Sequence, residues 1–246
     1  MKADPSRQRL LLDLQAIDTR IDQIAHAKAN LPQVKQIGAR SADLAGVKTD
    51  LVNAETAAGD IQRELTKSEQ DVQLVRDRAA RNRSRLESGA GSAKDLQALQ
   101  HELQSLARRQ SELEDLELAV MERAETLDRR VTELRAQRDE LADQVAALEA
   151  ERDEALRDLD AEAVTVGSGR ADLVAGIGED LAALYEKVRS TSGGLAAAEL
   201  RQGRCGGCQL ELHNVDLSRI RSAPEDEVVR CDECRRIMIR TGESGL

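Results

Sequence analysis

The sequence predicts a mainly α-helical protein: a long antiparallel coiled-coil hairpin with a short third helix at its base, followed by a small β unit. Three observations predict this fold class. The 246 residues include no Trp, no Phe and one Tyr, so the large side chains that build wide globular cores are missing. Apolar residues recur about every 3.5 positions over long stretches. All four cysteines lie near the C-terminal end, in two CxxC pairs.

The second predicted arm, residues 93–166, carries the clearest repeat. Positions that step by alternating three and four residues from Leu96 to Val166 are apolar in sixteen of twenty-one cases, and no Gly or Pro interrupts the segment. A 3.5-residue period held over about ten heptads is typical of a coiled-coil helix. At a rise of ~1.5 Å per residue, this arm spans ~110 Å.

The first predicted arm, residues 5–87, has a rougher repeat with the same spacing. Its phase slips near Pro32, which predicts a break at residues 29–32. We expect Asp4 to cap the first helix and Asn30 to cap the restarted one.

The Gly- and Ser-rich stretch at residues 88–92 separates the two arms. Arms joined by so short a turn must run antiparallel. A second break, "VGSGR", precedes an amphipathic base helix predicted at about 170–190. We therefore predict a helical domain over residues 1–190 and a separate C-terminal unit over 195–246.

The C-terminal unit holds the strongest chemical signal. Zn²⁺ prefers four deprotonated soft ligands in a tetrahedron, and two CxxC turns supply them. We predict one structural zinc ion in a zinc ribbon, because a segment with so few large apolar side chains needs the metal to fold. Two disulfides and a thiol redox or chaperone site are the rival interpretations. The predicted zinc ligands are Cys205, Cys208, Cys231 and Cys234.

The net charge of −10 argues against attraction of the whole chain to nucleic acid or to anionic membranes. We find neither a membrane-span signal nor a signal peptide, and we expect a cytoplasmic protein in which thiols stay reduced. No phosphate loop, nucleophile elbow or His-centred pattern indicates an enzyme, so no small-molecule substrate is expected.

Charge is unevenly distributed along the chain. Residues 76–109, which surround the predicted turn and are called the hairpin tip below, hold eight basic and four acidic side chains, a net charge of +4. This surface could bind a phosphate backbone or an acidic protein, or could be a solvated helix end. Without aromatic residues, a nucleic acid would be bound mostly through its charge. The candidate binding residues are Arg81, Arg83, Arg85, Lys94, Arg108 and Arg109.

Several motifs together resemble one family. The second arm begins "AKDLQALQHELQSL", the base helix ends "LAALYEKVR", and the cysteine pairs read "CGGC" and "CDECRRIMIR". This combination is similar to the bacterial C4-type zinc-ribbon proteins with a coiled-coil hairpin, over essentially the whole chain. Asp232 and Arg235 depart from the Pro and Gly that are more usual there. The resemblance implies a non-catalytic regulatory adaptor with a protein partner, some members being tied to an alternative sigma factor and to flagellar or secretion regulation.

Overall fold

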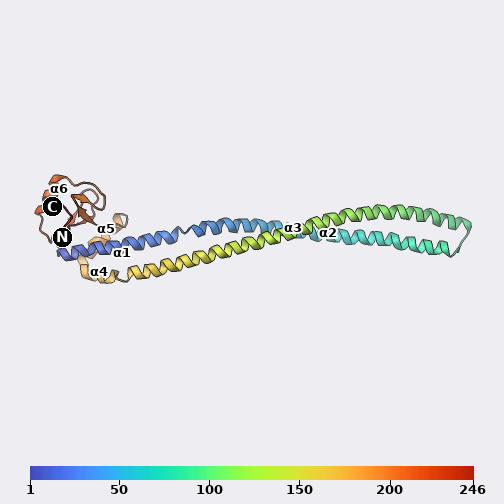
Figure 1. The fold of residues 1–246 in the computed structure, drawn as a ribbon, viewed down its shortest axis with the longest axis horizontal. Coiled ribbons are helices and arrows are strands. Elements are labelled where there is room, and N and C mark those ends of the chain that lie inside the picture. Colours follow the sequence, from blue (N-terminus) through green and yellow to red (C-terminus); the bar gives the residue numbers. More distant parts are fainter. The chain divides into compact units, whose positions relative to one another are not determined.

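The computed structural model describes residues 1–246, and its mainly helical architecture confirms the predicted fold class (Figure 1). The chain forms two compact units, one of residues 35–149 and one of residues 1–34 together with 150–246. The elements are α1 (Pro5–Ala29), α2 (Pro32–Glu87), α3 (Ala93–Gly167), α4 (Arg170–Ile177), α5 (Glu179–Thr191), β1 (Ala197–Arg201), β2 (Arg204–Cys205), α6 (Asn214–Ser222), β3 (Val229–Arg230) and β4 (Ile237–Ile239).

In the unit of residues 35–149, α2 and α3 lie side by side as antiparallel arms (Figure 1). Leu51 packs against Val131 and Leu134, and Ile61 packs against Val120. All buried residues of the two arms occupy positions of the predicted 3.5-residue repeat, so the periodicity identified the packed seam correctly. They are Leu51, Ile61, Val72, Asn82, Leu113, Val120, Ala124, Val131 and Leu134.

The break between α1 and α2 falls where Pro32 predicts it, but the capping differs from the expectation. Asp4 caps α1 as predicted, because its carboxylate accepts the Ser6 amide at 2.8 Å. Asn30 ends α1 instead of starting α2: its side-chain amide donates to the His26 carbonyl at 2.8 Å. The prediction for Asn30 was therefore wrong, since the short amide reaches the last orphan carbonyls of the preceding helix.

The predicted base helix is two helices, α4 and α5, separated at Gly178. This glycine has φ of 82°, a conformation that side-chain-bearing residues rarely adopt. A Cβ there would also collide with the guanidinium of Arg7, whose Nε donates to the Ile177 carbonyl at 2.7 Å. An arginine of α1 thus binds the end of α4 and needs a glycine beside it.

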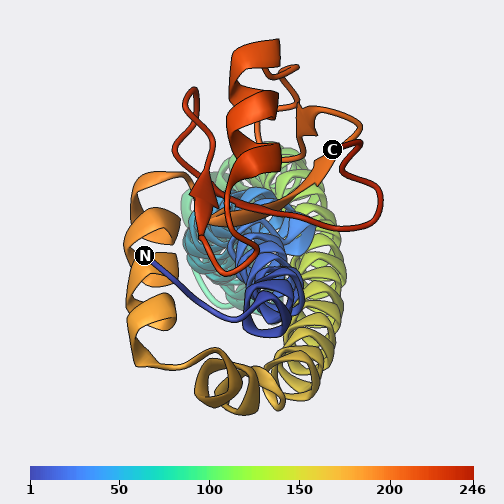
Figure 2. The same ribbon diagram turned by 90° about the vertical axis from the view of Figure 1, so that its left-hand side faces the viewer.

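The four strands form one sheet in the order β2-β1-β4-β3, with β1 parallel to β4. Ile237 and Ile239 of β4 pack with α1 and α5, whereas Met238 packs on the cysteine side. Figure 2 shows the C-terminal unit lying over α1 and α5. A strand buried on both faces joins two cores, so the sheet connects the cysteine cluster to α1, α4 and α5, which we call the helical base.

The helical base buries polar side chains of α1 that the 3.5-residue repeat does not mark: Gln8, Gln15 and Asp18. Asp18 is 1% exposed and accepts hydrogen bonds from Arg170 Nε at 2.6 Å and from the Tyr185 hydroxyl at 2.9 Å. Burial by itself would raise the pKa of Asp18, but these bonds and the charges of Arg170 and Arg189 outweigh it and lower that pKa. Asp18 is therefore a charged, fully partnered residue of the core.

We predict that Asp18→Asn lowers the free energy of unfolding by about 2–3 kcal/mol, because Arg170 and Arg189 lose their buried carboxylate partner and keep only the exposed Glu186 and Asp22. Urea denaturation followed by the near-ultraviolet circular dichroism of Tyr185 measures this change. Asp13→Asn, an exposed change on the same helix, is the matched control and should stay within about 0.5 kcal/mol of the wild type. Equal stability of the two variants would contradict the assigned role of Asp18.

Candidate metal centre

Each CxxC pair lies in a turn closed by the same two backbone hydrogen bonds. In the first turn, Cys205 N donates to Leu210 O at 3.0 Å and Gln209 N donates to Cys205 O at 2.7 Å. In the second, Cys231 N donates to Arg236 O and Arg235 N donates to Cys231 O, both at 2.9 Å. The two turns, called knuckles below, therefore present their cysteines in the same way.

The backbone of the knuckles explains the residues around the cysteines. Gln209 and Arg235, each directly after the second cysteine of a pair, have φ of 62° and 61°. A glycine would adopt this conformation freely, whereas other residues lose about 1 kcal/mol or more. In "CGGC", a Cβ on Gly206 would lie 2.7 Å from the Glu199 carbonyl oxygen, and one on Gly207 would lie 2.7 Å from Arg236 Cδ. Both glycines are therefore required by close packing.

The four sulfur atoms come together as the sequence predicts. Cys205 Sγ lies 3.8 Å from Cys234 Sγ, Cys208 Sγ lies 3.9 Å from Cys231 Sγ, and all four lie within 4.8 Å of one another. A tetrahedral zinc site with Zn–S bonds of about 2.3 Å has sulfur–sulfur edges of about 3.8 Å. A disulfide needs about 2.05 Å. The donor set and its spacing therefore fit zinc, and four thiolates leave no position for a reactive water.

Because two of the cysteines are buried, their thiols ionise only when a cation is bound beside them. Burial raises the pKa of the Cys205 thiol to about 12 and also raises the pKa of Cys231. Burial acts in the same sense on Cys234, but hydrogen bonds from the Arg236 amide and neighbouring thiols outweigh it and lower its pKa. At neutral pH the two buried thiols would be protonated without a metal, and zinc binding would release their protons.

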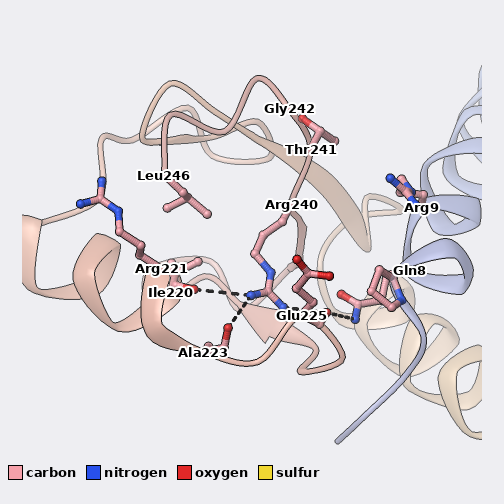
Figure 3. Close-up of a pocket in the computed structure, with 11 residues that line it drawn as sticks. Gln8, Arg9, Ile220, Arg221, Ala223, Glu225, Arg240, Thr241, Gly242 and Leu246 are labelled. Atoms are coloured by element: carbon pink, nitrogen blue, oxygen red, sulfur yellow. Dashed lines mark hydrogen bonds between the residues drawn. The ribbon is translucent and has the colours of Figure 1, made fainter.

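Arg240, which follows β4, binds backbone carbonyls and forms no ion pair. Arg240 donates to the carbonyl of Ala223 at 3.1 Å (Figure 3). It also donates to the carbonyls of Pro224 at 2.7 Å and Glu225 at 2.9 Å. It lies beside an open cavity of about 450 Å³ between α1 and the C-terminal unit. Arg240 holds the segment after α6 to the end of β4. Nothing in the sequence pattern indicates this role.

The candidate residues of the hairpin tip lie in the unit of residues 35–149, whereas the four cysteines belong to the other unit. Arg109 pairs with Glu112 at 3.3 Å, and Arg76 and Arg78 pair with carboxylates of α3. The remaining candidates are exposed and form no ion pair: Arg81, Arg83, Arg85, Lys94 and Arg108. Five of the eight basic side chains of the tip thus lie outside any ion pair.

These features define a class of protein: an antiparallel coiled-coil hairpin whose base carries a four-cysteine zinc ribbon. Residues 14–193 match the family described as the CT398-like coiled coil hairpin domain, and residues 204–238 match the C4-type zinc ribbon domain. The chain belongs to this CT398-like hairpin family. The zinc of the ribbon is structural.

Relatives and solved structures cover nearly the whole chain. An uncharacterized protein of Mycobacterium tuberculosis is 41% identical over 241 residues, which are 98% of this chain and 98% of that protein. A solved structure from Mycobacterium smegmatis has a TM-score of 0.82 and 37% identity, covering 98% of this chain and 100% of its own. CT398 from Chlamydia trachomatis has a TM-score of 0.64 and 16% identity, covering 96% and 98%, and is similar in fold alone. Among the helices, none combines the length and the apolar character that a membrane span requires.

We predict that Cys231→Ser abolishes stoichiometric zinc binding, because a hydroxyl is a poor replacement for a thiolate at a soft site. The C-terminal unit should lose its order, whereas most of the helicity should stay, since α2 and α3 bury their own seam. Metal analysis and far-ultraviolet circular dichroism measure the two effects. Ser222→Ala, an exposed change in the same unit, serves as the control, and full zinc content in Cys231→Ser would contradict the ligand assignment.

Proposed function

We propose that this protein is a non-catalytic cytoplasmic scaffold that uses the hairpin tip and the zinc ribbon as separate binding ends. One observation carries the proposal: the hairpin tip and the zinc ribbon differ in the sign of their net charge. Residues 76–109 hold eight basic and four acidic side chains, whereas residues 195–246 hold eight arginines against nine carboxylates, before any charge of the thiolates is counted. Surfaces of such different charge favour different partners.

The zinc site supports a structural and not a chemical role in this scaffold. Its four thiolates fill the coordination tetrahedron, so the metal offers no position for a substrate. The hairpin supports the same interpretation, because its buried positions are used by the seam and its polar positions face solvent. We infer that the binding partners are proteins, and that the tip recognises an acidic surface.

The scaffold proposal is tested by affinity capture with the full-length chain and two charge variants. The tip variant changes Arg81, Arg83, Arg85 and Lys94 to Gln. The ribbon variant changes the exposed Arg204, Arg221, Arg230 and Arg235 to Gln, which removes the same charge elsewhere. We expect each variant to lose a different set of proteins while both keep zinc and helicity. Identical partner sets for both variants and the wild type would overturn the proposal of two binding ends.

The second candidate function is regulation through nucleic-acid binding at the tip. The specific observation that favours it is that Arg81, Arg83 and Arg85 near the end of α2 and Lys94 at the start of α3 are exposed and form no ion pair. Exposed cations of this kind can neutralise phosphates of a nucleic-acid backbone. The lack of aromatic side chains restricts the contact to charge and hydrogen bonds, so sequence selectivity would be weak.

We predict that the wild-type chain is retained on RNA or duplex DNA near 50 mM salt, with a log–log salt slope of roughly one unit per neutralised phosphate. The tip variant should lose most of this binding and the ribbon variant little of it. Filter binding across a salt series measures both. Absence of retention at low salt would exclude this function and leave an acidic protein as the partner of the tip. Binding that only the ribbon variant loses would place the surface on the ribbon.

A further inference from the structure

One side chain contacts both knuckles and the segment that leaves the helical base. Arg236 lies two residues after Cys234, and its guanidinium donates to the Gly207 carbonyl, inside the first CxxC pair, at 3.2 Å. The same guanidinium donates to Ser192 O at 2.9 Å and to Leu195 O at 2.8 Å, just after α5. The position of Arg236 therefore depends on the knuckles, and the carbonyls after α5 depend on Arg236.

The same segment is held from the other side by α1. Gln15 Oε1 accepts the amides of Ala196 at 2.6 Å and Ala197 at 3.2 Å, and Gln15 Nε2 donates to Gly194 O at 2.9 Å. Gln15 is 5% exposed, so these bonds would not be replaced by water while the base is closed. Residues 192–197 thus lie between Arg236 of the C-terminal unit and Gln15 of the helical base.

The strands that follow this segment complete the apolar core of the base. Ala197 and Ile237 are fully buried in one cluster with Leu11, Leu14 and Tyr185. At the N-terminal end, Ala3 N donates to Asp226 O at 2.7 Å, so the first residues also pair with the C-terminal unit. If the sheet came apart, the buried face of α1 and α5 would lose its cover.

We propose that zinc occupancy controls the closure of the helical base, with Arg236 and residues 192–197 transmitting the state of the metal site to α1 and α5. The zinc-bound knuckles fix the positions of Arg236 and β4. Arg236 then holds residues 192–197, and β4 covers the apolar face of α1 and α5. Without zinc the C-terminal unit lacks a sufficient core, so Leu11, Leu14 and Tyr185 become accessible. The proposal stands whether or not the hairpin tip and the ribbon bind the proposed partners.

The only aromatic residue of the chain provides a direct measurement, because Tyr185 is fully buried in the base. Removing zinc from the full-length protein with a chelator should increase acrylamide quenching of Tyr185 fluorescence and abolish its near-ultraviolet circular dichroism. Most of the helical signal should remain, and added zinc should restore both Tyr185 signals. Unchanged Tyr185 signals after metal analysis shows complete zinc loss would overturn the proposal.

Arg236→Ala tests the assigned link with the metal in place. The variant should keep one zinc per chain, while the amides of Ala196 and Ala197 exchange about tenfold faster or more, since charge-assisted hydrogen bonds to the segment are lost. Arg221→Ala, which removes an exposed arginine of α6 outside the knuckles, is the matched control and should leave exchange unchanged. Loss of zinc from Arg236→Ala, or exchange equal to that of the control, would overturn the role of Arg236.

Coupling between two sites is reciprocal, so a change in the base must alter zinc affinity. Gln15→Met keeps the length of the side chain and removes its hydrogen bonds to residues 194–197. We expect it to lower zinc affinity by about fivefold or more in competition with a chromogenic chelator. Gln36→Met, an exposed change on α2, should have the zinc affinity of the wild type. Wild-type zinc affinity in Gln15→Met would show that the base and the metal site are independent.

Discussion

The closure of two CxxC turns on one tetrahedral ion is the interaction on which the C-terminal unit depends. Besides its cysteines, the core on that side of the sheet has five buried apolar residues: Leu200, Leu212, Ile220, Val229 and Met238. So small a core supplies little stabilisation, whereas a structural zinc contributes on the order of 10 kcal/mol or more to such modules. The strained backbone at Gln209 and Arg235 costs about 1–2 kcal/mol each, which the metal offsets easily.

This dependence extends into the helical base because β4 is buried on both faces. The same strand gives Met238 to the cysteine side and Ile237 and Ile239 to α1 and α5. A sheet placed against a helix also brings backbone amides into the core, and these need partners. Gln15 of α1 accepts two such amides, those of Ala196 and Ala197, and Gln8 donates to the carbonyls of Ala3 and Glu225. These bonds explain why buried positions of an otherwise apolar face are polar.

The sequence alone was sufficient to predict the structure of a segment where one repeated physical contact governs that whole segment. The 3.5-residue period reports the contact between two long helices, and it located every buried position of α2 and α3. CxxC spacing reports a tetrahedral metal, and it located the sulfur cluster. The buried Gln8, Gln15 and Asp18 could not be found in this way, because their partners lie more than 150 residues away in the chain. Gly178 depends likewise on the distant Arg7, and Arg236 on the distant carbonyls of Ser192, Leu195 and Gly207.

The ion pairs between the arms bear on the free charges of the tip. In the middle of the arms, the acidic residues belong to α2: Glu55 and Glu64 pair with arginines of α3. Nearer the turn, the basic residues belong to α2: Arg76 and Arg78 pair with Glu114 and Glu102. Because the charge on α2 changes sign along the arm, only one alignment of the two helices forms all of these pairs. Beyond Arg78 the pairs stop, although Arg81 and Arg85 follow four residues apart, an arrangement of like charges that destabilises a helix by about 0.2–0.5 kcal/mol. Arg85, in the last turn of α2, still interacts favourably with the helix dipole and with Asp95, whereas Arg81 has no ion-pair partner and is available to the anionic partner proposed for the tip.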